Sequence, residues 1–238
     1  MNLISLQLKT SANFQKNLSK LIKKIENSPS NSIILAPELF LTGYAYQRLD
    51  EASQLTKKAI NILKFLSHTK IIAITMTTKV NNNYFNTLYI FHNGSIVHTQ
   101  SKVQLFVLDD ERKYFTKGDL EDIKIINING IKIATLICFE LRFVDLVKRV
   151  QGADIIFVPA MWGRLRKENY ETLTQALAVT NQCYVIASDS SNKNMAKSSA
   201  IITPFGKVTK NDNSKIISSI YDKKEIKKMR RYLNVGIK

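Results

Sequence analysis

The sequence predicts an α/β fold in which two mixed β-sheets pack face to face and helices cover the outer faces. Strand-like and helix-like apolar patterns alternate along the chain, which favours the α/β class. The pairs Asn93-Gly94 and Asn129-Gly130 predict hairpins, so some neighbouring strands are antiparallel. Short continuous apolar runs, such as residues 33–36, are typical of strands buried on both faces. A simple doubly wound parallel sheet would not contain the hairpins, whereas two mixed sheets accommodate them.

The first half of the chain is expected to contain two helices, over residues 14–25 and 51–66. Apolar side chains recur at helical spacing in both segments, and Ser11 precedes the first as a candidate N-cap. Continuous or alternating apolar runs indicate the strands. These are expected over residues 3–8, 33–36, 71–77, 84–91 and 96–100.

The second half repeats the alternation, with helices expected over residues 140–150 and 168–181. Residues 221–238 are expected to form a short basic helix or tail. No linker, repeat or low-complexity segment interrupts the chain, which predicts one domain over residues 1–238. Strands are expected over residues 123–128, 131–137, 154–159, 183–188, 199–203, 207–209 and 216–220.

Composition and charge exclude several classes of protein. The 238 residues carry a formal net charge of +16, but the lysines are spread along the chain without interleaved aromatic residues. This favours a solvated basic surface over a specific nucleic-acid site. No apolar run is long enough to span a membrane and the N-terminus lacks a signal-peptide pattern, so a cytoplasmic location is expected. Two cysteines make no disulfide framework, and three scattered histidines predict no metal site.

Cys138 occupies the most informative position in the chain. An apolar β-rich run over residues 131–137 ends at this cysteine, and a charged, helix-compatible stretch follows it. Several hydrolases hold a nucleophile at such a strand-to-helix turn. The helix N-terminus would lower the pKa of the thiol and stabilise an oxyanion. The alternative is that Cys138 is an ordinary buried core cysteine.

Polar residues at other strand-to-loop junctions complete a chemical set with Cys138. Glu38 follows the run at residues 33–36, Lys102 follows the run at residues 96–100, and Glu111 lies in the next loop. A carboxylate can take the proton of a thiol, and an ammonium can stabilise the oxyanion of a tetrahedral intermediate. Each residue alone would more often be solvated, so the prediction rests on the combination.

Five segments of the chain resemble the nitrilase superfamily of carbon–nitrogen hydrolases. Together they extend over essentially the whole sequence and include three catalytic motifs in the family's order. The residues that carry the resemblance are Pro37-Glu38-Leu39-Phe40-Leu41-Thr42-Gly43-Tyr44, Lys102-Val103-Gln104-Leu105-Phe106 with Glu111 and Gly118, Ile137-Cys138-Phe139-Glu140-Leu141-Arg142-Phe143, Asn181-Gln182-Cys183-Tyr184-Val185, and Ser199-Ala200-Ile201-Ile202-Thr203-Pro204-Phe205-Gly206.

This resemblance implies an α-β-β-α sandwich that needs no cofactor and commonly forms a homodimer or larger homo-oligomer. By position, Glu38 would be the general base, Lys102 the oxyanion stabiliser and Cys138 the nucleophile. Glu111 would orient the lysine and the substrate amide, and the backbone N–H of Phe139 would complete the oxyanion hole. The chain departs from the family's usual pattern at Val144, Asn169-Tyr170 and Leu177, which concern the pocket rim and the dimer surface.

The motifs look most like those of the aliphatic and ω-amidase branches, which cleave small amides that often carry a distal carboxylate. Arg142, Arg164 or Arg166 would hold such a carboxylate through two hydrogen bonds. The alternatives are solvent exposure for Arg164 and Arg166 and a structural ion pair for Arg142.

Four further side chains are assigned from the residues around them. Tyr44 and Trp162 are candidates for the pocket wall, with ordinary packing as the alternative. Glu140 either lines the site or only stabilises the helix N-terminus. Cys183 lies in an apolar run and is expected in the core.

Three functions therefore follow from the sequence. The first is hydrolysis of a small linear amide through a thioester acyl-enzyme. The second is hydrolysis of an N-carbamoyl amino acid or amine, which releases carbon dioxide together with ammonia. The third is a catalytically weak member of the family that acts in binding or assembly. The complete set of Glu38, Lys102, Glu111 and Cys138 favours the two enzymes.

Overall fold

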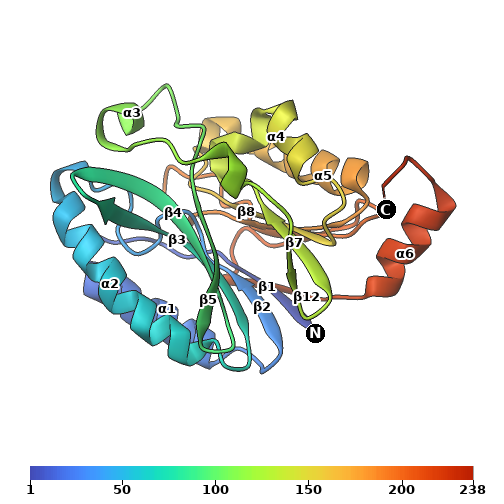
Figure 1. Cartoon of the computed structure of the whole chain (residues 1–238), viewed down its shortest axis with the longest axis horizontal. Helices are drawn as coiled ribbons and strands as arrows, with labels where there is room; N and C mark the ends of the chain where they lie inside the picture. The colour runs from blue at the N-terminus through green and yellow to red at the C-terminus, as the bar shows by residue number, and fades with distance from the viewer. Residues whose placement is uncertain (238) are drawn as a thin grey trace.

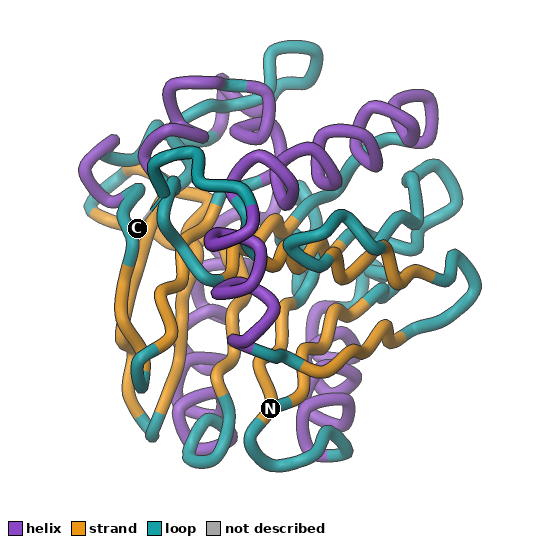
Figure 2. Tube along the Cα trace, turned by 90° about the vertical axis from the view of Figure 1, so that its right-hand side faces the viewer, coloured by secondary structure: helices purple, strands orange, loops and turns teal. Residues whose placement is uncertain are grey.

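The computed structural model describes residues 1–237 and consists of four layers, helix–sheet–sheet–helix (Figure 1). Helices α1 (Phe14–Glu26) and α2 (Leu49–Leu66) cover one sheet, and α4 (Val144–Arg149) and α5 (Lys167–Asn181) cover the other. Figure 2 shows the strands between these helical layers. The arrangement confirms the predicted sandwich of two mixed sheets. Lys238, the last residue of the expected basic tail, lies outside the described residues.

The first sheet has six strands in the order β12-β1-β2-β3-β4-β5. Strands β1, β2 and β3 are parallel, while β12, β4 and β5 pair antiparallel with their neighbours. The bounds are β1 (Asn2–Leu6), β2 (Ser32–Leu35), β3 (Ile71–Val80), β4 (Asn83–His92), β5 (Ser95–Ser101) and β12 (Ile216–Ile220).

The second sheet also has six strands, in the order β11-β10-β9-β8-β7-β6. Its centre, β7, β8 and β9, is parallel, and its edges are antiparallel. The bounds are β6 (Ile126–Ile128), β7 (Ile131–Thr135), β8 (Ile155–Pro159), β9 (Tyr184–Ser188), β10 (Ala200–Ile202) and β11 (Val208–Lys210).

Within residues 1–237, six other helices lie in the connections and near the C-terminus. The basic segment forms α6, which buries only Ile226 and Met229. None of the helices within residues 1–237 is long and apolar enough to cross a membrane. The remaining bounds are α3 (Glu111–Tyr114), α6 (Lys223–Tyr232) and the 3₁₀ helices η1 (Tyr46–Arg48), η2 (Leu120–Asp122), η3 (Cys138–Arg142) and η4 (Arg164–Arg166).

The central strands are apolar on both faces because each face packs against a different layer. In β2, Ile33 and Leu35 belong to the core between the sheets, whereas Ile34 belongs to the core under α1 and α2. Two hydroxyl groups also join the sheets directly. Ser5 donates a hydrogen bond to the Ala187 carbonyl, and Ser188 donates one to the Leu6 carbonyl, each at 2.6 Å.

Two local expectations were wrong. Asn13, not Ser11, caps α1, because the Asn13 side chain accepts the Lys16 N–H at 2.9 Å. The helix expected over residues 140–150 is divided into η3 and α4, since the backbone of Phe143 is extended (φ −101°, ψ 107°).

Candidate active site

The four polar side chains of the expected catalytic set come from both sheets. Glu38 follows β2 and Lys102 follows β5 in the first sheet, whereas Cys138 follows β7 in the second. Glu111 is the first residue of α3, in the connection after β5. The strand order of the first sheet makes Lys102 and Glu38 neighbours although they are more than sixty residues apart, and the face-to-face packing of the sheets adds Cys138. The structure therefore brings the sequence-predicted set to one place.

Cys138 lies at a strained turn between β7 and η3. Its φ of 51° is in the left-handed region, which residues other than glycine rarely adopt. Leu39, the residue after Glu38, has a φ of 45°, and its N–H donates to the Thr75 hydroxyl at 2.7 Å. Strained backbone therefore flanks functional groups of both sheets, as is common at active sites.

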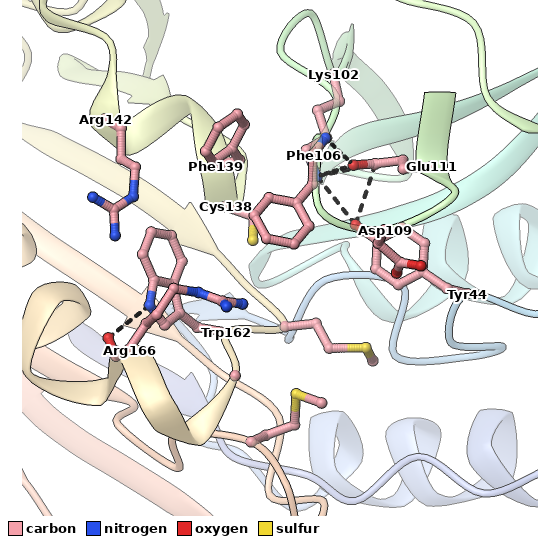
Figure 3. A pocket seen from close by; sticks show the side chains of 13 residues that line it. Tyr44, Lys102, Phe106, Asp109, Glu111, Cys138, Phe139, Arg142, Trp162 and Arg166 are labelled. Carbon is pink, nitrogen blue, oxygen red and sulfur yellow. Dashed lines mark hydrogen bonds and ion pairs between the residues drawn. The ribbon is translucent and has the colours of Figure 1, made fainter. Parts of the chain in front are cut away.

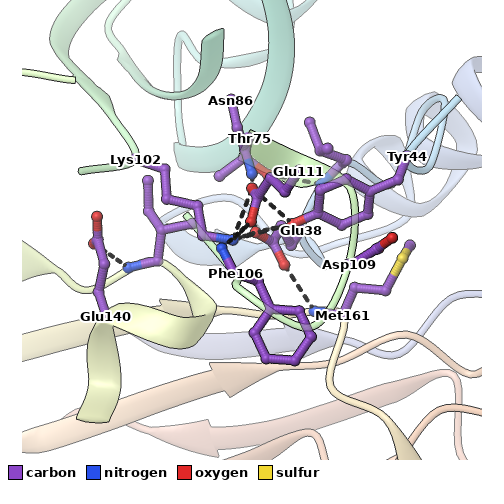
Figure 4. A network of polar contacts seen from close by, with 12 residues as sticks. Glu38, Tyr44, Thr75, Asn86, Lys102, Phe106, Asp109, Glu111, Glu140 and Met161 are labelled. Atoms are coloured by element: carbon purple, nitrogen blue, oxygen red, sulfur yellow. Dashed lines mark hydrogen bonds and ion pairs between the residues drawn. The ribbon is translucent and has the colours of Figure 1, made fainter. Parts of the chain in front are cut away.

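Lys102 is the centre of a buried polar network (Figure 4). Its Nζ lies 2.8 Å from Glu38 Oε1 and 3.0 Å from each carboxylate oxygen of Glu111. It also donates to the Tyr44 hydroxyl at 3.1 Å. The side chains of Lys102 and Glu38 are both 0% exposed. The network therefore holds an ammonium and two carboxylates away from water, in contact with one another.

Glu38 receives hydrogen bonds at both oxygens. Tyr44 lies 2.7 Å and the Asn86 amide 2.9 Å from Oε1, while the Met161 N–H donates to Oε2 at 3.1 Å. Sequence reasoning missed Asn86. The feature that could have identified Asn86 is its place in the β4–β5 hairpin, opposite the end of the strand that leads to Lys102. There its carbonyl accepts the Lys102 N–H at 2.9 Å. Asn86 therefore contacts both the Glu38 carboxylate and the backbone of Lys102.

Burial and charge set the protonation states of the network. Burial alone would lower the pKa of Lys102, but the charges of Glu38, Cys138 and Glu111 raise it, so the lysine is protonated. Burial raises the pKa of Glu111, and Lys102 opposes that shift. Burial and the charge of Glu38 raise the pKa of Cys138 well above its ordinary value. The sequence-based expectation of a lowered thiol pKa was wrong, because desolvation and the charge of Glu38 outweigh the opposing effects of Lys102 and the Met161 N–H.

A cavity of about 160 Å³ opens over Cys138. Figure 3 shows the sulfur between Lys102 and Glu111 on one side and Trp162 with two arginines on the other. The lining residues are Tyr44, Lys102, Phe106, Asp109, Glu111, Cys138, Phe139, Arg142, Met161, Trp162, Gly163, Arg166 and Met195.

Of the three arginines considered from the sequence, two line this cavity. The Arg142 guanidinium lies 5.2 Å from the centre of a Trp162 ring and donates to Asn169 at 2.9 Å. The Arg166 guanidinium lies 5.0 Å from the centre of the Phe106 ring. Arg164, the third candidate, is exposed and does not line the cavity.

Of the other three candidate substrate contacts, Trp162 and Tyr44 line the cavity and Glu140 does not. Trp162 is 4% exposed, donates its indole N–H to the Arg166 carbonyl at 2.7 Å and forms part of the wall. Tyr44 both lines the cavity and belongs to the polar network. Glu140 is 0% exposed and does not line the cavity, because its carboxylate points into the backbone beneath it. Among residues 1–237, no group of three or more His, Cys, Asp or Glu side chains could hold a metal ion.

Comparisons with known proteins identify the family of the chain. The chain matches the carbon–nitrogen hydrolase family over residues 4–227. It is 32% identical over 206 residues to a 2-oxoglutaramate amidase of Bacillus subtilis, covering 80% of this chain and 79% of that protein. It is 26% identical over 200 residues to the omega-amidase YafV of Escherichia coli, covering 81% and 77%. The crystal structure of Saccharomyces cerevisiae Nit3, of branch 10 of the nitrilase superfamily, superposes with a TM-score of 0.88 at 22% identity, covering 99% and 95%.

The match over residues 4–227 defines the class of this protein as a hydrolase, and its fold is shared with the superposed Nit3 structure. The chain belongs to the carbon–nitrogen hydrolase family, and it is an enzyme that hydrolyses carbon–nitrogen bonds.

Proposed function

We propose that this enzyme hydrolyses the amide bond of a small linear amide that carries a distal carboxylate, through a thioester at Cys138. The observation that supports this most directly is the buried network of Lys102, Glu38 and Glu111 at one side of the cavity into which the Cys138 sulfur points. Two relatives named as amidases, which cover four fifths of this chain, support the choice of an amide.

In the first half of the reaction, the Cys138 sulfur attacks the amide carbon while Glu38 takes the thiol proton. A neutral thiol suits this step, because the proton leaves only as the new carbon–sulfur bond forms. Glu38 Oε2 accepts one backbone N–H and retains a lone pair for that proton. Lys102 and the backbone N–H of Phe139 stabilise the oxyanion. The carbon–nitrogen bond then breaks, and Glu38 returns its proton to the departing ammonia.

The second half of the reaction regenerates the thiol. Water attacks the thioester carbon and gives a proton to Glu38, and the same donors stabilise the second oxyanion. The carbon–sulfur bond breaks, the carboxylic acid is released, and Glu38 returns the proton to the Cys138 sulfur. Glu111 acts by holding the Lys102 ammonium through both of its oxygens at 3.0 Å. Dividing one acyl transfer into two easier steps is the gain from covalent catalysis.

The distal carboxylate is assigned from the charges on the far wall of the cavity. Arg166 and Arg142 line that wall, beside Trp162, Phe106 and Phe139. A volume of about 160 Å³ suits a short aliphatic chain between the reacting amide and a charged end. Guanidinium groups bind carboxylates through two parallel hydrogen bonds. We therefore propose ω-amides of dicarboxylic acids as the substrate class.

Ammonia release by the purified protein tests this function. The panel holds amides of glutaramate and succinamate type, neutral aliphatic amides and N-carbamoyl amino acids, with Cys138→Ala as the control. Ammonia that depends on Cys138 and is fastest with a carboxylate-bearing amide is the expected result. Carbon dioxide released with the ammonia would favour the carbamoyl hydrolase instead. An inert panel, together with a Cys138 that iodoacetamide does not alkylate, would favour the binding or assembly role.

A matched pair of variants on η4 tests the carboxylate site. Arg166→Met removes a guanidinium that lines the cavity, whereas Arg164→Met removes an exposed one that does not. We expect Arg166→Met to raise KM for a carboxylate-bearing amide about 30-fold, as loss of about 2 kcal/mol of charged hydrogen bonding would. KM for a neutral amide should change little in either variant. Equal effects of the two substitutions would refute the assignment.

We also propose that residues 1–238 act as one domain, which forms a homodimer in the cytoplasm. Exposed apolar side chains on α4 and α5, including Val144 at 69% and Val179 at 40%, support a protein contact on this side. The free thiols of Cys138 and Cys183 suit a reducing compartment. The mass in solution of the protein and of a Val179→Glu variant tests the assembly, since the glutamate should shift a dimer toward monomer.

A further inference from the structure

Glu140 is a buried carboxylate that the proposed reaction does not use. Its side chain is 0% exposed and lies outside the cavity lining. Oε1 accepts the Val103 N–H at 2.7 Å, and Oε2 accepts the Ile137 N–H at 2.7 Å. Each of these N–H groups comes from a residue adjacent to a catalytic group, since Val103 follows Lys102 and Ile137 precedes Cys138. The Glu140 carboxylate thus connects the backbone beside Lys102 with the backbone beside Cys138.

This connection crosses between the two sheets. Lys102 follows β5 of the first sheet, and Cys138 follows β7 of the second. Other contacts of the Lys102 backbone stay on its own side, namely those with Asn86 and with Gly118, each at 2.9 Å. The Glu140 bonds therefore form a short polar link between the strand end that carries the ammonium and the turn that carries the thiol.

The energetics indicate that this link has a purpose beyond packing. A buried carboxylate is unfavourable, and burial raises the pKa of Glu140 to about 7 even though the N–H groups of Ile137 and Val103 oppose the shift. The turn that it holds contains Cys138 in the left-handed region, which needs support from its surroundings. Glu140 also donates its own N–H to the Ile137 carbonyl at 3.0 Å, so the turn is closed from both directions.

We propose that Glu140 is a positioning residue that fixes the separation between the Lys102 ammonium and the Cys138 sulfur. This inference rests on the proposed function, in which the ammonium must meet the oxyanion that forms beside the sulfur. Glu140 itself touches no substrate. Its loss should impair formation of the tetrahedral intermediate more than substrate binding, because Glu140 does not line the cavity, whereas Phe106, Trp162 and Arg166 do.

Two variants and one control test the role. Glu140→Gln keeps the shape but presents an NH₂ to one of the two N–H groups, so one hydrogen bond is replaced by a clash of donors. Glu140→Asp keeps the charge but is one methylene too short to reach both groups. Thr56→Val is the control, because it removes a buried hydrogen bond of 2.7 Å to the Thr77 carbonyl under α2, in the outer layer.

The measurements are kcat and KM on the best substrate of the panel, the rate of Cys138 alkylation by iodoacetamide, and the thermal midpoint. For Glu140→Gln we expect kcat to fall about 100-fold with KM within about threefold, since a displacement of about 1 Å has this effect. Alkylation should slow several-fold. Glu140→Asp should lie between Glu140→Gln and the unchanged enzyme. Thr56→Val should lower the midpoint but keep kcat and the alkylation rate.

The outcomes separate this inference from the proposed function. Alkylation needs no amide, so slower alkylation in Glu140→Gln supports the positioning role even if the substrate class is wrong. Unchanged kcat and alkylation in folded Glu140 variants would overturn it. So would a loss of kcat in Thr56→Val equal to that in Glu140→Gln, because stability alone would then explain the effect. Failure of both Glu140 variants to fold would assign the carboxylate to folding and overturn the catalytic role.

Discussion

Replacing Lys102 by methionine should affect stability as well as turnover. Lys102 has 0% exposure and holds Glu38 at 2.8 Å and Glu111 at 3.0 Å. The methionine fills a similar volume but leaves two buried carboxylates facing each other without a cation. Removing one partner of a buried ion pair lowers the free energy of unfolding by about 3–5 kcal/mol. For a chain of this size, that corresponds to a fall of about 6–20 °C in Tm.

The loss of stability in Lys102→Met should depend on pH, and the pKa of Glu111 sets the direction of this dependence. Burial already raises its pKa, and Lys102 lowers it, so removing the lysine raises it further. The native variant then binds a proton that the unfolded chain releases, and its stability falls as pH rises above the ordinary pKa of glutamate. Urea unfolding at pH 6 and pH 8 measures this, and Lys102→Met should be less stable relative to the unchanged protein at pH 8.

A double variant separates stability from catalysis. Lys102→Met with Glu111→Gln removes one of the two carboxylates, so most of the lost stability should return and the difference between pH 6 and pH 8 should shrink. Turnover should stay at the level of Lys102→Met, because the oxyanion still lacks its ammonium. Equal stability of Lys102→Met and the unchanged protein at both pH values would refute the description of this network as ionised and mutually dependent.

Three further outcomes follow from the same contacts. Tyr44→Phe should lower kcat about tenfold with little change in KM, because its hydroxyl contacts Glu38 at 2.7 Å; an unchanged kcat would contradict this. Cys183→Ser should retain turnover, measured as ammonia release, since Cys183 is 0% exposed in the core; complete loss in a folded variant would mean that Cys183 reacts. Burial raises the pKa of Asp189 to about 7, so native Asp189 keeps a proton that the unfolded chain loses from about pH 4 upward. Asp189→Asn should therefore gain stability relative to the unchanged protein as pH rises from 5 to 7, and urea unfolding that shows no such gain would refute the shift.

Sequence reasoning reached the fold because its signals are local. The Asn93-Gly94 and Asn129-Gly130 pairs form hairpin turns between paired strands, and the continuous apolar run in β2 is buried from both sides. The alternation of strands and helices followed from the same patterns. The capping of α1 by Asn13 was missed because several polar residues precede the helix, and only the side-chain contact distinguishes them.

The site was less accessible from sequence, because its properties depend on distance and burial. The positions of Glu38, Lys102 and Cys138 at strand ends, with Glu111 in the loop after Lys102, identified the set, but not the sign of the thiol's pKa shift. That sign follows from the burial of the thiol beside Glu38. The role of Glu140 was also hidden, since the sequence does not show that a residue two positions after Cys138 reaches the Val103 N–H.

Because the site is distributed over two sheets, the proposed reaction of the Cys138 thiol requires both sheets to be folded and docked. Glu38 and Lys102 arrive with the first sheet and Cys138 with the second, and hydroxyls such as Ser5 and Ser188 connect the two only when they are docked. In a chain in which only the second sheet is formed, the Cys138 thiol has no contact with Glu38 or Lys102. The proposed chemistry therefore requires the two sheets to be docked, and we expect it to be lost when the layers separate.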